Sequence, residues 1–174
     1  MAEAALGLGT NLGDREAYLA RAVEALAETG GIRLEQVSRL YRTAPWGVSD
    51  QPDFLNLCVL IETDLSPEAL LAACKRIESE LGRRDGLRWG PREIDIDLLI
   101  MPGVTMDTET LSLPHPRMGL RRFVLDPLAE IVPGWMIGET TVQEQSAALK
   151  RDAADQMCEP DEDATRRFAL LRST

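Results

Sequence analysis

Residues 66–103 read SPEALLAACKRIESELGRRDGLRWGPREIDIDLLIMPG. Ser66 is a good N-cap and Pro67 suits the first helical position, so a helix is predicted from here to Gly82. Its apolar stripe is Leu70, Leu71, Cys74, Ile77 and Leu81. From 94 to 100 apolar residues alternate with others before Pro102 and Gly103, which predicts a strand. The stretch is therefore a helix and a strand joined by an arginine-rich loop.

Toward the N-terminus, segments with the periodicity of a strand and of a helix alternate. Ala4–Leu8 is predicted as a strand that leaves through Gly7, Gly9 and Asn11 into a tight loop, and a helix follows from Asp14 to Gly30 and Gly31. Strands are expected over 32–41 and 55–61. The order β-α-β, β-α-β matches the ferredoxin-like split βαβ arrangement, an α+β fold with an antiparallel sheet and two helices packed on one face.

The C-terminal third is less regular. Helices are expected around 120–131 and 142–151, and the acidic stretch Glu159–Asp163 is expected to be mobile. With 174 residues, 44% hydrophobic and 28% charged, the chain fits one domain, 1–174, that folds without disulfide or metal staples.

The net charge is −10, and it is unevenly spread. Residues 1–75 carry −5, residues 76–122 carry 0 and residues 123–174 carry −5. A uniformly basic face for DNA or an anionic membrane is not expected, although local anion binding is. Three widely spaced cysteines without a CxxC, of which Cys58 and Cys74 are predicted in the core, favour a reducing compartment. With no signal peptide and no apolar membrane span, a cytoplasmic soluble protein is expected.

Asp95 and Asp97 lie two residues apart in the last predicted strand, so both side chains project from one face, about 6.6 Å apart along the chain. Ile94, Ile96 and Leu98 would line the opposite, core face. Two carboxylates on one face repel each other unless a cation lies between them, and their oxygens suit Mg²⁺. The alternative is the solvated polar face of an edge strand.

The loop before this strand, GRRDGLRWGPR at 82–92, holds four arginines and one acid. The arginines are Arg83, Arg84, Arg88 and Arg92. Arginine presents a planar fork that binds phosphate oxygens in pairs, and flanking glycines let a loop close over a ligand. Arginines leading into paired aspartates favour a polyphosphate bound with magnesium. The alternative is a solvated loop whose arginines pair with surface acids.

Two other segments carry side chains suited to a ligand. His115 is the only histidine, and it lies between prolines shortly before Arg121, Arg122 and Phe123. The segment TAPWGVSDQPDFLN at 43–56 is rich in prolines and aromatic residues. An aromatic slot for a planar heterocycle, with the amide of Asn56 at its edge, would use Trp46, Phe54, Trp89 and Phe123. The alternatives are a structural histidine and a rigid turn that packs its aromatic side chains into the core.

Four segments together resemble the 6-hydroxymethyl-7,8-dihydropterin pyrophosphokinases of folate biosynthesis. They are LGLGTNLGD at 6–14, SRLYRTAPWGVSDQPDFLN at 38–56, RWGPREIDIDLL at 88–99, and LPHPRM with RRFVLDPLAEI within 113–131. The resemblance implies transfer of the β,γ-pyrophosphoryl group of ATP to the pterin hydroxymethyl oxygen, with release of AMP. It implies two Mg²⁺ ions as cofactor and ATP and a reduced pterin as partners. We expect a monomer that binds neither nucleic acid nor membrane.

Carried over position by position, the resemblance also implies roles for single residues. Asp95 and Asp97 would hold the metal ions and form the catalytic set with Arg83 and Arg92. The nucleotide would contact Arg84, Trp89, Leu98, Ser112, His115 and Arg121. The pterin would lie between Phe54 and Phe123, near Asn56, Thr43, Ala44 and Trp46. The loops at 43–53 and 83–92 would close to exclude water.

Several positions depart from the family pattern. Ala44 stands where proline is usual and Phe54 where tyrosine is common. The arginine loop is about one residue shorter than in some relatives, so Arg84 need not align with the second loop arginine. Asp126 replaces an apolar residue, and its carboxylate would need a partner such as Arg122 or solvent. Residues from about 138 match poorly and are assigned no role.

Two other functions stay open at this point. Paired aspartates with arginines fit other Mg²⁺-dependent phosphoryl or nucleotidyl transferases. A non-catalytic domain that binds a nucleotide or a pterin is also compatible with a ferredoxin-like fold.

Overall fold

The computed structural model describes residues 1–44, 52–83, 94–152 and 156–172, with only the backbone of Arg83. The N-terminal elements are β1 (Ala2–Thr10), α1 (Arg15–Glu28), β2 (Ile32–Val37), β3 (Tyr41–Thr43), β4 (Phe54–Thr63), α2 (Pro67–Arg83) and β5 (Asp95–Ile100). The C-terminal elements are β6 (Met106–Asp107), β7 (Ser112–Leu113), the 3-10 turn η1 (Met118–Leu120), α3 (Arg122–Ile131), β8 (Met136–Ile137), β9 (Thr140–Thr141), α4 (Val142–Asp152), β10 (Cys158–Pro160) and α5 (Glu162–Arg172).

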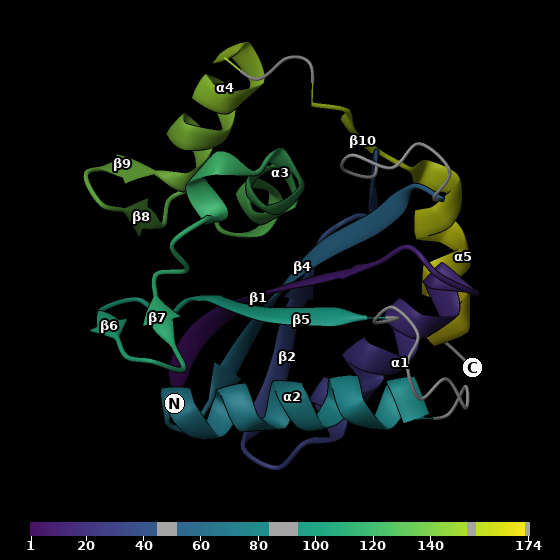
Figure 1. The fold of residues 1–174 in the computed structure, drawn as a ribbon, viewed down its shortest axis with the longest axis horizontal. Helices are drawn as coiled ribbons and strands as arrows, with labels where there is room; N and C mark the ends of the chain where they lie inside the picture. Colours follow the sequence, from purple (N-terminus) through teal and green to yellow (C-terminus); the bar gives the residue numbers. More distant parts are fainter. Residues whose placement is uncertain (45–51, 84–93, 153–155, 173–174) are drawn as a thin grey trace.

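The central sheet has the strand order β10-β3-β4-β1-β5, and β2 also pairs with β4. The pairs β1–β4, β1–β5, β2–β4, β3–β4 and β10–β3 are all antiparallel. Helices α1 and α2 lie together on one side of the sheet, as Figure 1 shows, and α3 and α4 lie on the other. The α+β, ferredoxin-like prediction is therefore confirmed, with one face of the sheet partly covered by α3 rather than left open.

Local sequence explains where the first two helices begin. The side chain of Asp14 accepts a hydrogen bond from the Ala17 amide at 3.2 Å, and Ser66 Oγ accepts one from the Ala69 amide at 3.1 Å. Each satisfies an N-H that the first turn cannot pair within the helix. The predicted cap at Ser66 is confirmed. The predicted stop at Gly82 is wrong, because α2 includes Gly82 and reaches Arg83.

Two apolar cores pack on the two faces of the sheet. The larger core joins α1, α2 and α5 to the sheet and contains Ile94, Ile96 and Leu98. The smaller core joins α3 to the opposite face, where Cys58 and Leu99 point. The prediction that Ile94, Ile96 and Leu98 face the core is confirmed, as is the burial of Cys58 and Cys74. The alternation along β5 thus leaves Asp95 and Asp97 on the α3 side.

The single strand predicted over 32–41 is wrong, because the chain leaves the sheet between β2 and β3. The Arg39 amide donates to Glu130 Oε1 at 2.8 Å, and the Leu40 amide donates to Thr165 Oγ1 at 3.0 Å. Side chains of α3 and α5 thus replace strand partners at this bend. No local pattern could have indicated partners so distant in the chain.

The first strand is longer than predicted. It runs to Thr10, so Gly7 and Gly9 lie inside β1 and not in a loop after it. Gly9 pairs directly with Asn56 of β4. A glycine inside a strand often marks a place where another group approaches the backbone closely.

The expected mobility of Glu159–Asp163 is also wrong. Residues 158–160 form β10, which pairs with β3, and α5 starts at Glu162. Phe168 of α5 is 4% exposed and packs into the larger core. Arg167 binds Glu16 of α1 at 2.7 Å. The tail, which received no role from the sequence, completes one edge of the sheet and covers α1.

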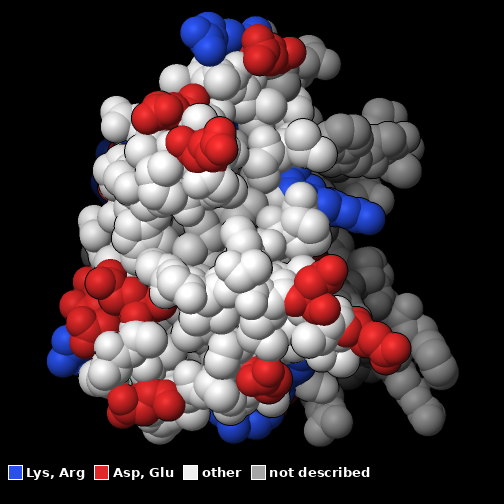
Figure 2. Space-filling model, turned by 90° about the vertical axis from the view of Figure 1, so that its left-hand side faces the viewer, with Lys and Arg blue, Asp and Glu red and all other residues white. Residues whose placement is uncertain are grey.

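The net charge is spread over separate groups. Figure 2 shows one face of the molecule, on which acidic side chains form several separate groups among uncharged residues. Among the helices of the described ranges, none has the length and apolar character needed to cross a membrane.

Candidate active site

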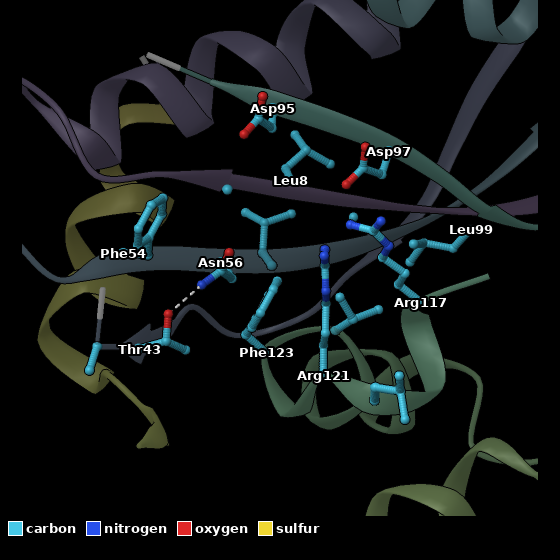
Figure 3. A pocket seen from close by; sticks show the side chains of 16 residues that line it. Leu8, Thr43, Phe54, Asn56, Asp95, Asp97, Leu99, Arg117, Arg121 and Phe123 are labelled. Atoms are coloured by element: carbon cyan, nitrogen blue, oxygen red, sulfur yellow. Dashed lines mark hydrogen bonds between the residues drawn. The ribbon is translucent and has the colours of Figure 1, made fainter. Parts of the chain in front are cut away.

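The aspartates of β5 border a hollow on the α3 side of the sheet. Asp95, Asp97 and Leu99 line a cavity of about 550 Å³ whose other walls come from β1, β3, β4 and α3. In Figure 3 both carboxylates point from β5 into this space. The volume is in the range of pockets that bind small molecules.

One end of the cavity has the composition of a slot for a flat, polar ring. Phe54 and Asn56 of β4 and Phe123 of α3 line it, and Asn56 lies between the two rings in the view of Figure 3. Asn56 Nδ2 donates to Thr43 Oγ1 at 3.0 Å, which fixes the buried amide. The amide group also offers a second N-H and a carbonyl oxygen.

Gly9 forms the floor beneath Asn56. A Cβ atom at Gly9 would lie well inside 3.0 Å of Asn56 Oδ1, a separation that real Cβ atoms essentially never show. The missing side chain at position 9 is therefore what lets the Asn56 amide lie over β1.

Two arginines supply positive charge opposite the aspartates. Arg117 and Arg121 line the same cavity, and in Figure 3 both side chains extend from the α3 side toward the strands. The guanidinium carbon of Arg121 is 5.5 Å from the centre of the Phe123 ring. In this view Arg121 lies on the side of that ring away from Phe54. The ring therefore has one face toward the slot and one toward a cation.

A second hollow of about 260 Å³ adjoins the first on the other side of β5. It is lined by Asp97, Leu98, Ser112 and His115, together with residues of α2 and of the 108–111 turn. Ser112 Oγ donates to Asp107 Oδ1 at 2.9 Å across the β6–β7 pair. Because Asp97 borders both hollows, ligands in the two would meet at the acidic strand.

His115 is held by backbone contacts on both sides. Its amide donates to Leu99 O at 2.8 Å, and its Nδ1 accepts from the Arg117 amide at 3.2 Å. Partial burial lowers the pKa of His115 below 6.5, and the charges of Arg121 and Arg117 lower it further against the opposing effect of Asp97. The ring is therefore neutral at pH 7, with Nδ1 as the acceptor and the proton on Nε2.

The donor set fits magnesium. Within the described ranges, no group of three or more His, Cys, Asp or Glu side chains gathers as a metal site. Mg²⁺ is commonly held by one or two carboxylates together with substrate phosphates and water. A pair of aspartates on one strand, open to a cavity, is therefore a suitable set of ligands.

The structure brings most of the residues that the sequence singled out to these two hollows. The larger one contains Asp95, Asp97, Thr43, Ala44, Phe54, Asn56, Phe123 and Arg121. The smaller one contains Leu98, Ser112 and His115. Arg121, expected near the nucleotide, lines the larger hollow beside Phe123. Trp46, Arg84, Trp89 and Arg92 lie outside the described residues, as does the side chain of Arg83.

Sequence reasoning missed Gly9 and Arg117. The signal for Gly9 was a glycine within an apolar run, which suits a strand with a close neighbour as well as a loop. Arg117 lies two residues after His115, but only the turn at η1 directs it into the cavity.

The fold and the two hollows that share Asp97 suit a small α+β enzyme that binds two ligands beside an acidic strand. The family described as 7,8-dihydro-6-hydroxymethylpterin-pyrophosphokinase (HPPK) matches residues 5–133, and the chain belongs to this family.

Curated relatives agree with this placement. The chain is 53% identical to a 2-amino-4-hydroxy-6-hydroxymethyldihydropteridine pyrophosphokinase of Methylorubrum extorquens, over 86% of this chain and 94% of the relative. It is 48% identical to the protein of the same name from Bacillus subtilis, over 72% of this chain and 75% of the relative.

The same fold is found in a solved structure. An HPPK-DHPS of Plasmodium falciparum superposes with a TM-score of 0.69 at 16% identity, over 88% of this chain. The chain spans 46% of the length of that structure. The family resemblance seen in the four sequence segments is confirmed by the family match and the curated relatives, without recourse to the fold.

Proposed function

We propose that this chain transfers a pyrophosphoryl group from ATP to 6-hydroxymethyl-7,8-dihydropterin in folate biosynthesis. In this reaction the hydroxymethyl oxygen bonds to the β-phosphorus, the bond between that phosphorus and the oxygen bridging to the α-phosphate breaks, and AMP leaves. The observation that carries the proposal is that Asp97 borders both the cavity that contains the aromatic slot and the hollow with His115. The acceptor and the triphosphate would meet there.

The aromatic slot is the proposed pterin site. A flat ring between Phe54 and Phe123 would bury apolar faces, and the Asn56 amide would read its polar edge. Thr43 holds that amide in place through its hydroxyl. Orientation of this kind supplies much of the rate in a transfer between two bound substrates.

The smaller hollow is the proposed site of the nucleotide. Leu98 offers an apolar surface there, and Ser112 and the neutral His115 offer hydrogen-bonding groups. Arg117 and Arg121 lie where negative charge of the transferred group would gather. Arg83, Arg84 and Arg92 would complete the phosphate contacts, Trp89 the nucleotide contacts, and Ala44 and Trp46 the pterin contacts.

Asp95 and Asp97 are proposed to hold two Mg²⁺ ions. When bound, these ions neutralise phosphate charge and orient the triphosphate. We further propose a cytoplasmic monomer with ATP and a reduced pterin as its partners and no contact with nucleic acid or membrane. Light scattering after gel filtration would test the monomer.

Identification of the nucleotide product tests the proposed function. The protein is incubated with Mg·ATP and reduced hydroxymethylpterin, and the nucleotides are separated by chromatography. AMP with a diphosphorylated pterin is expected. ADP as the product would indicate another phosphoryl transferase. Such an enzyme is expected to have no affinity for the pterin. Saturable binding without any product would indicate a non-catalytic binding domain.

A further inference from the structure

A buried polar cluster connects the first turn of α3 to α4. Arg122 Nε and Nη2 each lie 3.3 Å from Asp126 Oδ2, and Ser146 Oγ donates to Asp126 Oδ1 at 2.9 Å. Asp126 is 5% exposed and Ser146 is 3% exposed. The partner expected for Asp126 from the sequence is confirmed as Arg122, and Ser146 adds a second one.

The same arginine also holds the tail. Arg122 Nη1 donates to Gln156 O at 2.7 Å, and Nη2 donates to Cys158 O at 3.3 Å. The Arg122 amide donates to Gln156 Oε1 at 3.3 Å. Helix α3 has no side-chain cap from its own N-cap residue, Arg121, so Gln156 satisfies one amide of the first turn. One guanidinium thereby joins α3 to the strand β10.

Both sides of this connection continue directly into the aromatic slot. On the α3 side, Phe123 follows Arg122 and lines the cavity. On the tail side, Cys158 pairs with Thr43 in the ladder between β10 and β3. Thr43 lines the cavity and accepts the hydrogen bond of Asn56. The cluster therefore links the wall that carries Phe123 to the wall that carries Thr43 and Asn56.

We propose that Arg122 and Asp126 are positioning residues that set the distance between the two walls of the slot and so determine affinity for the pterin. The inference rests on the proposed function, since it assigns the slot to the pterin. A buried ion pair is a weak source of stability, and apolar residues of similar volume often replace one without loss. Apolar residues cannot replace the bonds from Arg122 to the two tail carbonyls.

This difference allows stability to be separated from positioning. The double variant Arg122→Met/Asp126→Leu removes both charges together, so no unpaired charge stays buried and the protein should fold. Its melting temperature should fall only by what the lost bonds of Ser146 and the two tail carbonyls contribute. Its KM for the pterin should rise about 10-fold to 100-fold, while its KM for ATP stays within about twofold of wild type. Direct pterin binding, measured by fluorescence, should weaken by the same factor.

A conservative variant and a matched control complete the test. Arg122→Lys keeps a positive charge beside Asp126 but cannot reach three acceptors as a planar fork does, so its pterin KM should be intermediate. Arg172→Met removes a tail arginine that binds Glu24 at 3.2 Å on the α1 face, and its pterin KM should not change. If the double variant does not fold, the pterin KM of Arg122→Lys tests the inference.

An unchanged pterin KM in a folded Arg122 variant would overturn the inference, and so would an equal rise in the KM of both substrates. If the wild-type protein is active, either result leaves the proposed function unaffected. Absence of pterin turnover and binding in the wild-type protein would instead overturn the proposed function and this inference together.

Discussion

Replacing Gly9 by alanine should displace the Asn56 amide and so weaken binding of the pterin in the slot. The new Cβ would lie well inside 3.0 Å of Asn56 Oδ1, so the amide oxygen must move by at least about 0.5 Å in a close-packed interior. The amide is planar, so its nitrogen moves as well, and the 3.0 Å bond to Thr43 is strained or broken. Losing a buried hydrogen bond costs about 1–3 kcal/mol when one partner stays unpaired.

The assay compares binding and turnover. Gly9→Ala should raise the pterin KM about 10-fold to 100-fold, because misplacement of a positioning group by about 1 Å can cost that much. Urea unfolding should report the loss of about 1–3 kcal/mol. Gly30→Ala is the matched control, since Gly30 has an ordinary φ and a methyl group added to it would meet no atom within 4 Å, and both measurements should match wild type.

A double-mutant cycle isolates the cause. In an Asn56→Ala background the amide is gone, so Gly9→Ala should have little further effect on the pterin KM. An equal effect of Gly9→Ala in both backgrounds would show that the new methyl group acts on something other than Asn56, and the reasoning would be refuted.

Three other predictions concern the metal ligands, the tail and the histidine. Asp97→Ala should abolish turnover while the free energy of unfolding changes by less than about 0.5 kcal/mol, and a variant with wild-type turnover would disprove the metal assignment. Phe168→Ala should lower the free energy of unfolding in urea by about 3–5 kcal/mol because Phe168 is 4% exposed, whereas Leu170→Ala, at a position 68% exposed in the same helix, should not. The single histidine allows a direct NMR titration, which should place the pKa of His115 below 6.5. Because the unfolded chain then binds the proton more readily, His115 should reduce stability as the pH falls below 6.5 and should have no effect above it, and a pKa at or above 6.5 would contradict this.

Much of the site could be predicted because it depends on short-range periodicity. Alternation along β5 places Asp95 and Asp97 on one face whatever the rest of the chain does, since side chains of a strand alternate between its faces. The need of Asp126 for a partner followed from the cost of burying a carboxylate, and Arg122 lies one helical turn away. Both features depend only on residues that are close together in the sequence.

Other features depended on residues far apart in the chain. The bend between β2 and β3 exists because Glu130 and Thr165 satisfy the amides of Arg39 and Leu40. The acidic stretch at 159–163 is ordered because β10 pairs with β3, although its composition favours solvent. Local patterns contain no information on such partners.

The amino-acid sequence by itself determined the strands β4 and β5 and the helix α3, the face on which the aspartates lie and the family to which the chain belongs. Only the tertiary structure decided that Gly9 lies beneath Asn56, that Arg117 enters the cavity and that the tail is tied to the slot through Arg122. The physical reason is that periodicity and capping act over a few residues, whereas steric contact and hydrogen bonding between packed elements act between any residues that folding brings together.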